Sequence, residues 1–152
     1  MVDRFERFSL IMAEISRCWH KLAVEEMERL GLKGGHVTYF LALARNEEGL
    51  TASQLCEDYG KDKSDVSRMM AILEQKGLVK KEGGHQKGYR GVFVLTEEGW
   101  KIADYVRYKS GIAARVAGKE LTDEQRAALY FAMEGIAASM RNMCQNGGIP
   151  EE

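Results

Sequence analysis

The chain has 152 residues and a mass of 17.1 kDa, and 45% hydrophobic with 30% charged residues is a composition typical of one folded domain rather than a disordered chain. No apolar run approaches the roughly 18 residues of a membrane-spanning helix, and the N-terminal residues lack the apolar core of a secretory signal. We therefore expect a cytoplasmic protein without membrane contact. We also expect no cofactor and no metal, because disulfide or metal-ligand spacing is absent among Cys18, Cys56, Cys144, His20, His36 and His85.

The formal net charge of −1 argues against a nucleic-acid partner, but the charge is unevenly distributed. Residues 61–91 hold eight Lys and Arg against four acids, a net charge of +4, so the rest of the chain carries −5. A basic segment inside a slightly acidic protein is the feature that a function has to explain.

Residues 3–30 predict one long helix, because apolar residues recur at steps of three and four before Gly31. This helix is longer than a small monomeric core requires, so its apolar stripe favours a partner. A second helix is predicted over about 36–46. Thr51 and Gln54 form the pattern of a capping box for a short third helix that ends at Gly60.

A fourth helix begins at Asp62, which can cap it, and ends at Gly77. Its inner stripe consists of Val66, Met69, Met70 and Leu73, and polar residues fall mainly on the opposite face. The period then changes from 3.6 to 2. Residues 78–82 and 92–95 predict two short strands joined by a glycine-rich tip over 83–91.

Two long helices complete the chain. Thr96 caps the first, which runs to about residue 117 and carries Glu97 and Glu98 in its first turn. The last helix spans about 123–144 and opens with a second capping box, Thr122 and Gln125. The predicted fold class is mainly α with a small antiparallel β-hairpin.

Two short helices followed by a hairpin with a basic tip form a winged helix-turn-helix. The second helix of this motif lies in the DNA major groove and reads base edges with its N-terminal half. A solvated amphipathic helix explains the charges of that half equally well, but the basic residues on the glycine-rich tip favour DNA. The predicted DNA contacts of the recognition helix are Lys61, Lys63, Ser64, Asp65, Ser67 and Arg68, and those of the wing are His85, Gln86, Lys87 and Arg90.

The sequence resembles the MarR family of winged-helix transcriptional regulators. The resemblance is most specific at Gly49-Leu50-Thr51, Leu55, Lys63-Ser64-Asp65-Val66-Ser67-Arg68, Leu73-Glu74-Gln75-Lys76-Gly77-Leu78-Val79 and Val94-Leu95-Thr96-Glu97-Glu98-Gly99. It implies that Ser64, Ser67 and Arg68 face DNA. The family's wing usually carries Asp-x-Arg before its second strand, and here Arg90 matches while Gly88 replaces the acid.

The resemblance also implies a homodimer joined through its first and last helices. Residues 36–96 would form the DNA-binding lobe of a single 152-residue chain, and residues 3–32 and 97–144 the dimerisation helices. Such a dimer binds a palindromic operator on double-stranded DNA, with two recognition helices about one turn (~34 Å) apart. The expected function is a transcriptional regulator, and a repressor is favoured.

Many relatives release DNA when a small aromatic or lipophilic effector binds. The candidate effector pocket consists of Trp19, His20, Tyr39, Phe40, Tyr105 and Tyr108, although aromatic residues at helical spacing are more often core or interface.

Other readings of the sequence stay open. Cys18 could make the protein a redox-sensing regulator, but an ordinary buried or half-buried thiol is favoured, and burial is also expected for Cys56. A winged-helix protein-interaction module without DNA binding is a further alternative. Catalytic sequence motifs are absent, so no enzyme is expected.

Overall fold

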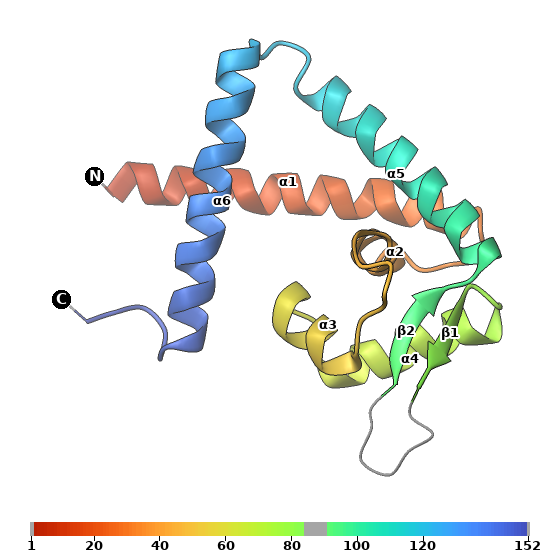
Figure 1. Ribbon diagram of the computed structural model, residues 1–152. Coiled ribbons are helices and arrows are strands. Elements are labelled where there is room, and N and C mark those ends of the chain that lie inside the picture. The colour runs from red at the N-terminus through yellow and green to blue at the C-terminus, as the bar shows by residue number, and fades with distance from the viewer. Residues whose placement is uncertain (1, 84–90, 152) are drawn as a thin grey trace. The chain divides into compact units, whose positions relative to one another are not determined.

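The computed structural model describes residues 2–83 and 91–151, and in that part of the chain it has six helices and one antiparallel hairpin. The bounds of these elements are α1 Val2–Glu28, α2 His36–Arg45, α3 Ala52–Tyr59, α4 Lys63–Gln75, β1 Val79–Glu82, β2 Val92–Leu95, α5 Glu97–Ala117 and α6 Asp123–Gln145 (Figure 1). The chain divides into two compact units, Met1–Lys109 and Ser110–Glu152. The prediction of a mainly helical fold with a small hairpin is confirmed.

The core of the first unit lies among α2, α3, α4 and the hairpin, which are gathered together in Figure 1. Strands β1 and β2 pair in antiparallel register, with Val79 opposite Leu95 and Glu82 opposite Val92. Leu50, just before α3, adds an isolated bridge to Phe93 of β2. The helix-turn-helix therefore rests against the hairpin, which is the arrangement of a winged helix.

Local sequence signals fix where the helices of this unit begin and end. The predicted capping box of Thr51 and Gln54 is present at the start of α3, and Gly60 ends the helix in the left-handed conformation at φ 64°. Asp62 caps α4 through its side chain, as predicted. The turn between the two helices of the motif is thus short and well determined.

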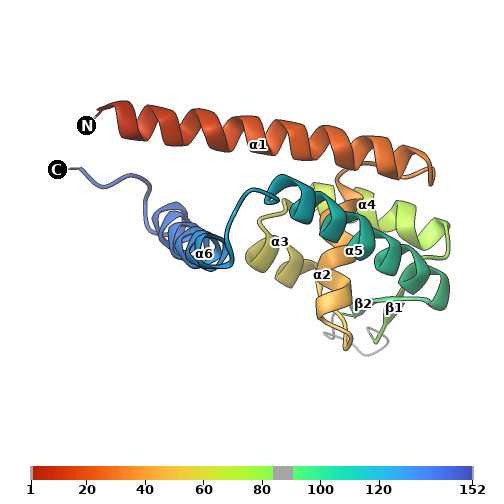
Figure 2. The same ribbon diagram turned by 90° about the horizontal axis from the view of Figure 1, so that it is seen from above.

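Helix α1 is shorter than predicted, because it ends at Glu28 rather than Leu30. The chain turns there, and the backbone N–H groups of Leu30 and Leu32 both donate to the carbonyl of Met27. Gly31, between them, adopts a positive φ of 68°. The C-terminal part of α1 is anchored by buried Ala23 and Met27, whereas residues 9–22 are all exposed. Figure 2 shows α1 running beyond the elements that its C-terminal part packs on.

The second unit contains the end of α5 and all of α6. The capping box of Thr122 and Gln125 is present at the start of α6, which confirms the prediction. Arg126 closes the preceding turn by donating from Nη2 to the carbonyl of Gly118 at 3.1 Å, and it pairs with Asp123 at 3.1 Å. No residue of α6 is buried. Its exposed large apolar residues are Leu129, Tyr130, Phe131, Met133, Ile136 and Met140.

Candidate nucleic-acid interface

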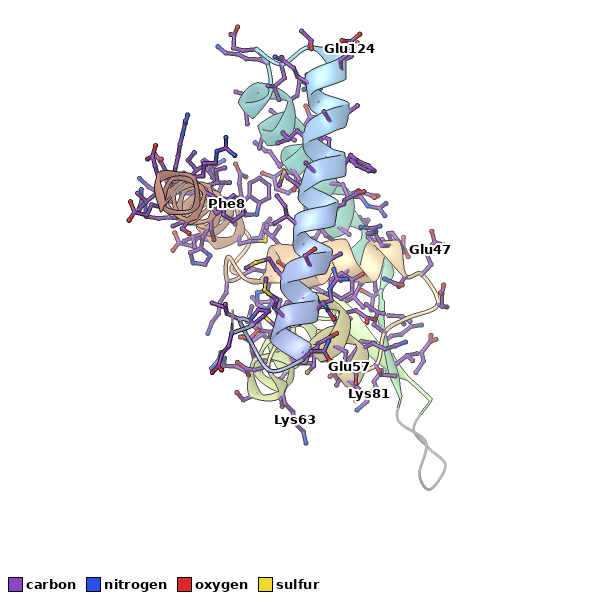
Figure 3. The ribbon with its side chains drawn as sticks, turned by 90° about the vertical axis from the view of Figure 1, so that its left-hand side faces the viewer. Phe8, Glu47, Glu57, Lys63, Lys81 and Glu124 are labelled. Atoms are coloured by element: carbon purple, nitrogen blue, oxygen red, sulfur yellow. The ribbon has the colours of Figure 1, made fainter. Side chains whose placement is uncertain are left out.

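Helix α4 has one apolar face and one polar face. Val66, Met69, Met70 and Leu73 are buried, as the sequence predicts. Lys63, Ser64, Ser67 and Arg68 are exposed on the other side, and Lys63 projects outward from the first turn in Figure 3. The helix therefore offers solvent a polar N-terminal half of the kind that enters a DNA groove.

The first turn of this helix is rigidly capped. Oδ1 of Asp62 accepts the backbone N–H of Asp65 at 2.7 Å and the Ser64 hydroxyl at 2.8 Å. These hydrogen bonds, the backbone one first, lower the pKa of Asp62, so its carboxylate stays charged at the positive end of the helix. The hydroxyl proton of Ser64 is committed to the cap, which leaves its oxygen to accept.

Lys61 is not part of the recognition helix, contrary to the prediction. It precedes the capping residue Asp62, in the turn after Gly60. Its Nζ lies 5.4 Å from the centroid of the Tyr39 ring, a cation–π distance. Lys61 thus stands beside the start of α4 rather than on it.

Asp65 is held from two sides. The hydroxyl of Tyr39, a fully buried residue of α2, donates to Oδ2 of Asp65 at 2.7 Å. Nη2 of Arg68 donates to Oδ1 of the same carboxylate at 3.0 Å. Burial and the Asp65 carboxylate raise the pKa of Tyr39, so this phenol stays neutral and keeps donating. Both oxygens of Asp65 are therefore engaged inside the protein.

A buried histidine joins the start of α2 to the middle of α4. Nδ1 of His36 accepts the backbone N–H of Lys33 at 3.0 Å, so Nε2 carries the proton and donates to the carbonyl of Met69 at 3.2 Å. The ring is fully buried, and this burial lowers the pKa of His36. In its neutral form the ring ties α4 to α2 with both nitrogens satisfied.

The hairpin adds further basic residues. Lys80 on β1 pairs with Glu82 at 3.1 Å, and Nζ of Lys81 lies 5.3 Å from the centroid of the Phe93 ring. The predicted wing contacts His85, Gln86, Lys87 and Arg90 lie outside the described residues. They and the recognition-helix contacts remain predictions.

A cavity of about 410 Å³ lies between α1, the following turn and α4. Of the six candidate pocket residues only His20 lines it; Tyr39 and Phe40 are fully buried core residues. Tyr105 donates to Oε2 of Glu26 at 2.6 Å, and Trp19 and Tyr108 are exposed. The structure does not gather the six around this cavity, and an effector pocket remains a prediction.

The expectation that Cys18 is at least half buried is wrong. Cys18 is exposed because it lies in the part of α1 that no other element of its unit covers, and Cys56 is half buried rather than buried. Among residues 2–83 and 91–151, no group of three or more His, Cys, Asp or Glu could hold a metal ion. No helix in the same part of the chain is long and apolar enough to cross a membrane.

The roles of Tyr39 and His36 were missed by sequence reasoning. Each supports α4 from a position about thirty residues away, and a buried aromatic residue carries no local signal of its partner. The only available hint was that an Asp at the third position of a helix and an Arg three residues later can pair on one face.

Comparison with known proteins agrees with this geometry. Residues 30–88 match the model of the MarR family. No curated protein sequence matches the chain at a significant level.

Solved structures match over most of the chain. One is a regulator assigned to the MarR family from Listeria monocytogenes, complexed with a 26mer DNA: TM-score 0.82, 19% identity, 93% of this chain and 95% of that chain covered. A MarR transcriptional regulator from Methanosarcina mazei Go1 gives TM-score 0.79 and 18% identity, covering 88% and 89%. Wild-type MarR of E. coli gives TM-score 0.67 and 17% identity, covering 84% and 94%.

The fold is thus that of a winged-helix regulator. The resemblance to the MarR family is confirmed: residues 30–88 match the family's model, and the chain has the fold seen in MarR-family transcriptional regulators.

Proposed function

We propose that this protein is a sequence-specific DNA-binding transcriptional regulator that acts as a homodimer on palindromic double-stranded DNA. The observation that carries the proposal is the polar outer face of α4, where Lys63, Ser67 and Arg68 are exposed at the N-terminal half of a winged-helix recognition helix. A similar fold is found in a structure complexed with DNA.

The charge distribution supports the same partner. The recognition helix and hairpin segment carry +4, and on a duplex these charges replace counterions bound to phosphates. Arg68 presents a guanidinium of the geometry that pairs with O6 and N7 of guanine, and the lysines suit phosphates. A protein-binding module has no need for so many basic residues in this one segment.

The dimer is supported by the apolar faces that the single chain leaves in solvent. Leu10, Ile15 and Leu22 on α1 are exposed by 72%, 55% and 51%. Exposed apolar residues also run along α6. Contiguous apolar surface of this kind marks an interface, and a second copy supplies a matching apolar face for each.

In vitro selection of bound DNA from a random pool tests the proposal. We expect a palindrome whose half-sites lie about one turn apart, ~34 Å from centre to centre. Arg68→Ala and Lys101→Ala each remove one positive charge, but only Arg68 lies on α4, so only its loss should change the selected sequence. Enrichment of no sequence contradicts DNA recognition and favours a protein partner, and enrichment of a single, unrepeated site contradicts the dimer.

A further inference from the structure

We infer that Tyr39 and Asp65 are positioning residues for Arg68, and that the contact from Tyr39 through Asp65 to Arg68 sets the sequence specificity of DNA binding. This inference rests on the proposed function and deepens it. Asp65, predicted as a DNA contact, acts through Arg68 instead.

The geometry makes Asp65 a fixed acceptor rather than a reader of bases. Its Oδ2 is taken by the Tyr39 hydroxyl at 2.7 Å and its Oδ1 by Arg68 Nη2 at 3.0 Å. Both oxygens are used, and a carboxylate beside phosphates is repelled by them. In the major groove only the amino groups of cytosine (N4) and adenine (N6) offer a carboxylate a hydrogen-bond donor.

The buried residue Tyr39 makes the Tyr39–Asp65–Arg68 contacts rigid. An exposed Asp–Arg pair three residues apart on a helix is weak, because both side chains lose rotamer freedom to form it. Here Tyr39 is fully buried, so its hydroxyl cannot follow a swinging carboxylate, and Asp65 retains only 26% of its side-chain exposure. The entropy of ordering the carboxylate is lost on folding, before DNA binds.

Within residues 2–83 and 91–151, Arg68 is held through Nη2 alone, and its side chain remains accessible. Its side chain is 62% exposed, and Nη2 is the nitrogen that bonds to Asp65. The remaining donors of the guanidinium are available to a base edge or phosphate. A preordered arginine discriminates between sites better than a free one, since a mobile side chain finds partners on many sequences.

The hydroxyl of Tyr39 and the face of its ring act on different cations. The hydroxyl controls Arg68 through Asp65, while the ring face lies under Lys61, 5.4 Å from its Nζ. Tyr39→Phe removes the first contact and keeps the second. Tyr105→Phe is a matched control, because it also removes a phenol hydroxyl that donates to a carboxylate, Glu26, at 2.6 Å, between α1 and α5.

The test measures binding of the selected palindrome and of a scrambled duplex to wild type, Tyr39→Phe, Tyr105→Phe and Arg68→Ala. We expect Tyr39→Phe to lower the ratio of the two affinities by roughly fivefold, as loss of preorganisation does. Tyr105→Phe should leave the ratio unchanged. In an Arg68→Ala background, Tyr39→Phe should have no further effect on the ratio, because the hydroxyl acts through that arginine.

Nitrogen-15 relaxation of the arginine Nε–H groups provides a readout without DNA. The Arg68 group should be ordered in the wild type and mobile in Tyr39→Phe. An unchanged specificity ratio, an equal loss in the Arg68→Ala background, or an Arg68 that stays equally ordered would overturn the inference while the proposed function stands. Failure of the wild type to select any DNA contradicts the proposed function, and with it the inference.

Discussion

The winged-helix lobe and the terminal helices differ in how far their apolar side chains are buried within the single chain. In the lobe the apolar residues are buried together, and the buried polar groups of Tyr39 and His36 each have partners in the same chain. Residues 9–22 of α1 and all of α6 lack buried side chains, although they carry many large apolar ones. The lobe buries its apolar residues within one chain, whereas the terminal helices leave theirs exposed, as the proposed homodimer requires. Each prediction below probes one side of this difference.

The largest effect is expected from a methyl group added where the first turn of α5 packs against the lobe. A Cβ at Gly99 would lie 1.9 Å from the backbone oxygen of Leu78. This clash is with backbone, so it can be relieved only by moving the backbone of α5 or of the residues around Leu78. We expect Gly99→Ala to lower the free energy of unfolding by about 3 kcal/mol, measured by urea denaturation.

The same change in the second unit should act in the opposite direction. A Cβ at Gly111, on the solvent side of α5, would meet nothing within 4 Å. Gly111→Ala is therefore expected to stabilise the helix by about 1 kcal/mol. Equal destabilisation by both substitutions would contradict the contrast between the two regions.

A charge placed on the apolar face of α6 should separate the dimer. Ile136 is 42% exposed in the single chain, and we expect Ile136→Glu to raise the dimer dissociation constant on the order of 100-fold, measured by analytical ultracentrifugation. Ala138→Glu, two residues on and so on the opposite face, is the control and should leave the dimer intact. The account of the terminal helices fails if wild type is monomeric, or if both variants dissociate equally.

The buried histidine predicts a smaller, pH-dependent effect in the lobe. Burial lowers the pKa of His36 in the folded chain, whereas in the unfolded chain it titrates near its ordinary value of 6.5. The unfolded state therefore binds the extra proton first, and stability is full above that pH and is lost as pH falls through the folded pKa. The slope is at most about 1.4 kcal/mol per pH unit for one proton.

Urea unfolding between pH 7.5 and 5 measures this contribution. His36→Gln should lower stability at pH 7.5 and flatten the loss on acidification, because no imidazole remains at this buried position. His20→Gln is the control, since His20 is exposed. A wild-type slope that survives unchanged in His36→Gln would exclude His36 as its source.

Most element boundaries were predictable because their signals are local. Thr51 with Gln54 and Thr122 with Gln125 mark helices that start at the next residue, and the structure has both capping boxes. The end of α1 was misplaced because it depends on the turn that follows. Lys61 was counted with the recognition helix although it precedes Asp62, the cap that the sequence correctly predicts.

The supports of the candidate site could not be predicted in the same way. Tyr39 and His36 reach Asp65 and the carbonyl of Met69 across 26 and 33 residues of chain. Their partners are set by how α2 packs on α4, and periodicity alone does not give that packing. Sequence reasoning could thus place Arg68 on the outer face of a helix but not identify what holds it there.

The most direct test of the account is the effect of every single base-pair change in the selected palindrome on binding by wild type and by Arg68→Ala. We predict that wild type loses about tenfold at one position in each half-site, symmetrically placed, consistent with ~1–3 kcal/mol for a bidentate arginine contact. Arg68→Ala should bind more weakly and be indifferent to the base at those two positions. Identical profiles for the two proteins would contradict the claim that the outer face of α4 reads DNA through Arg68.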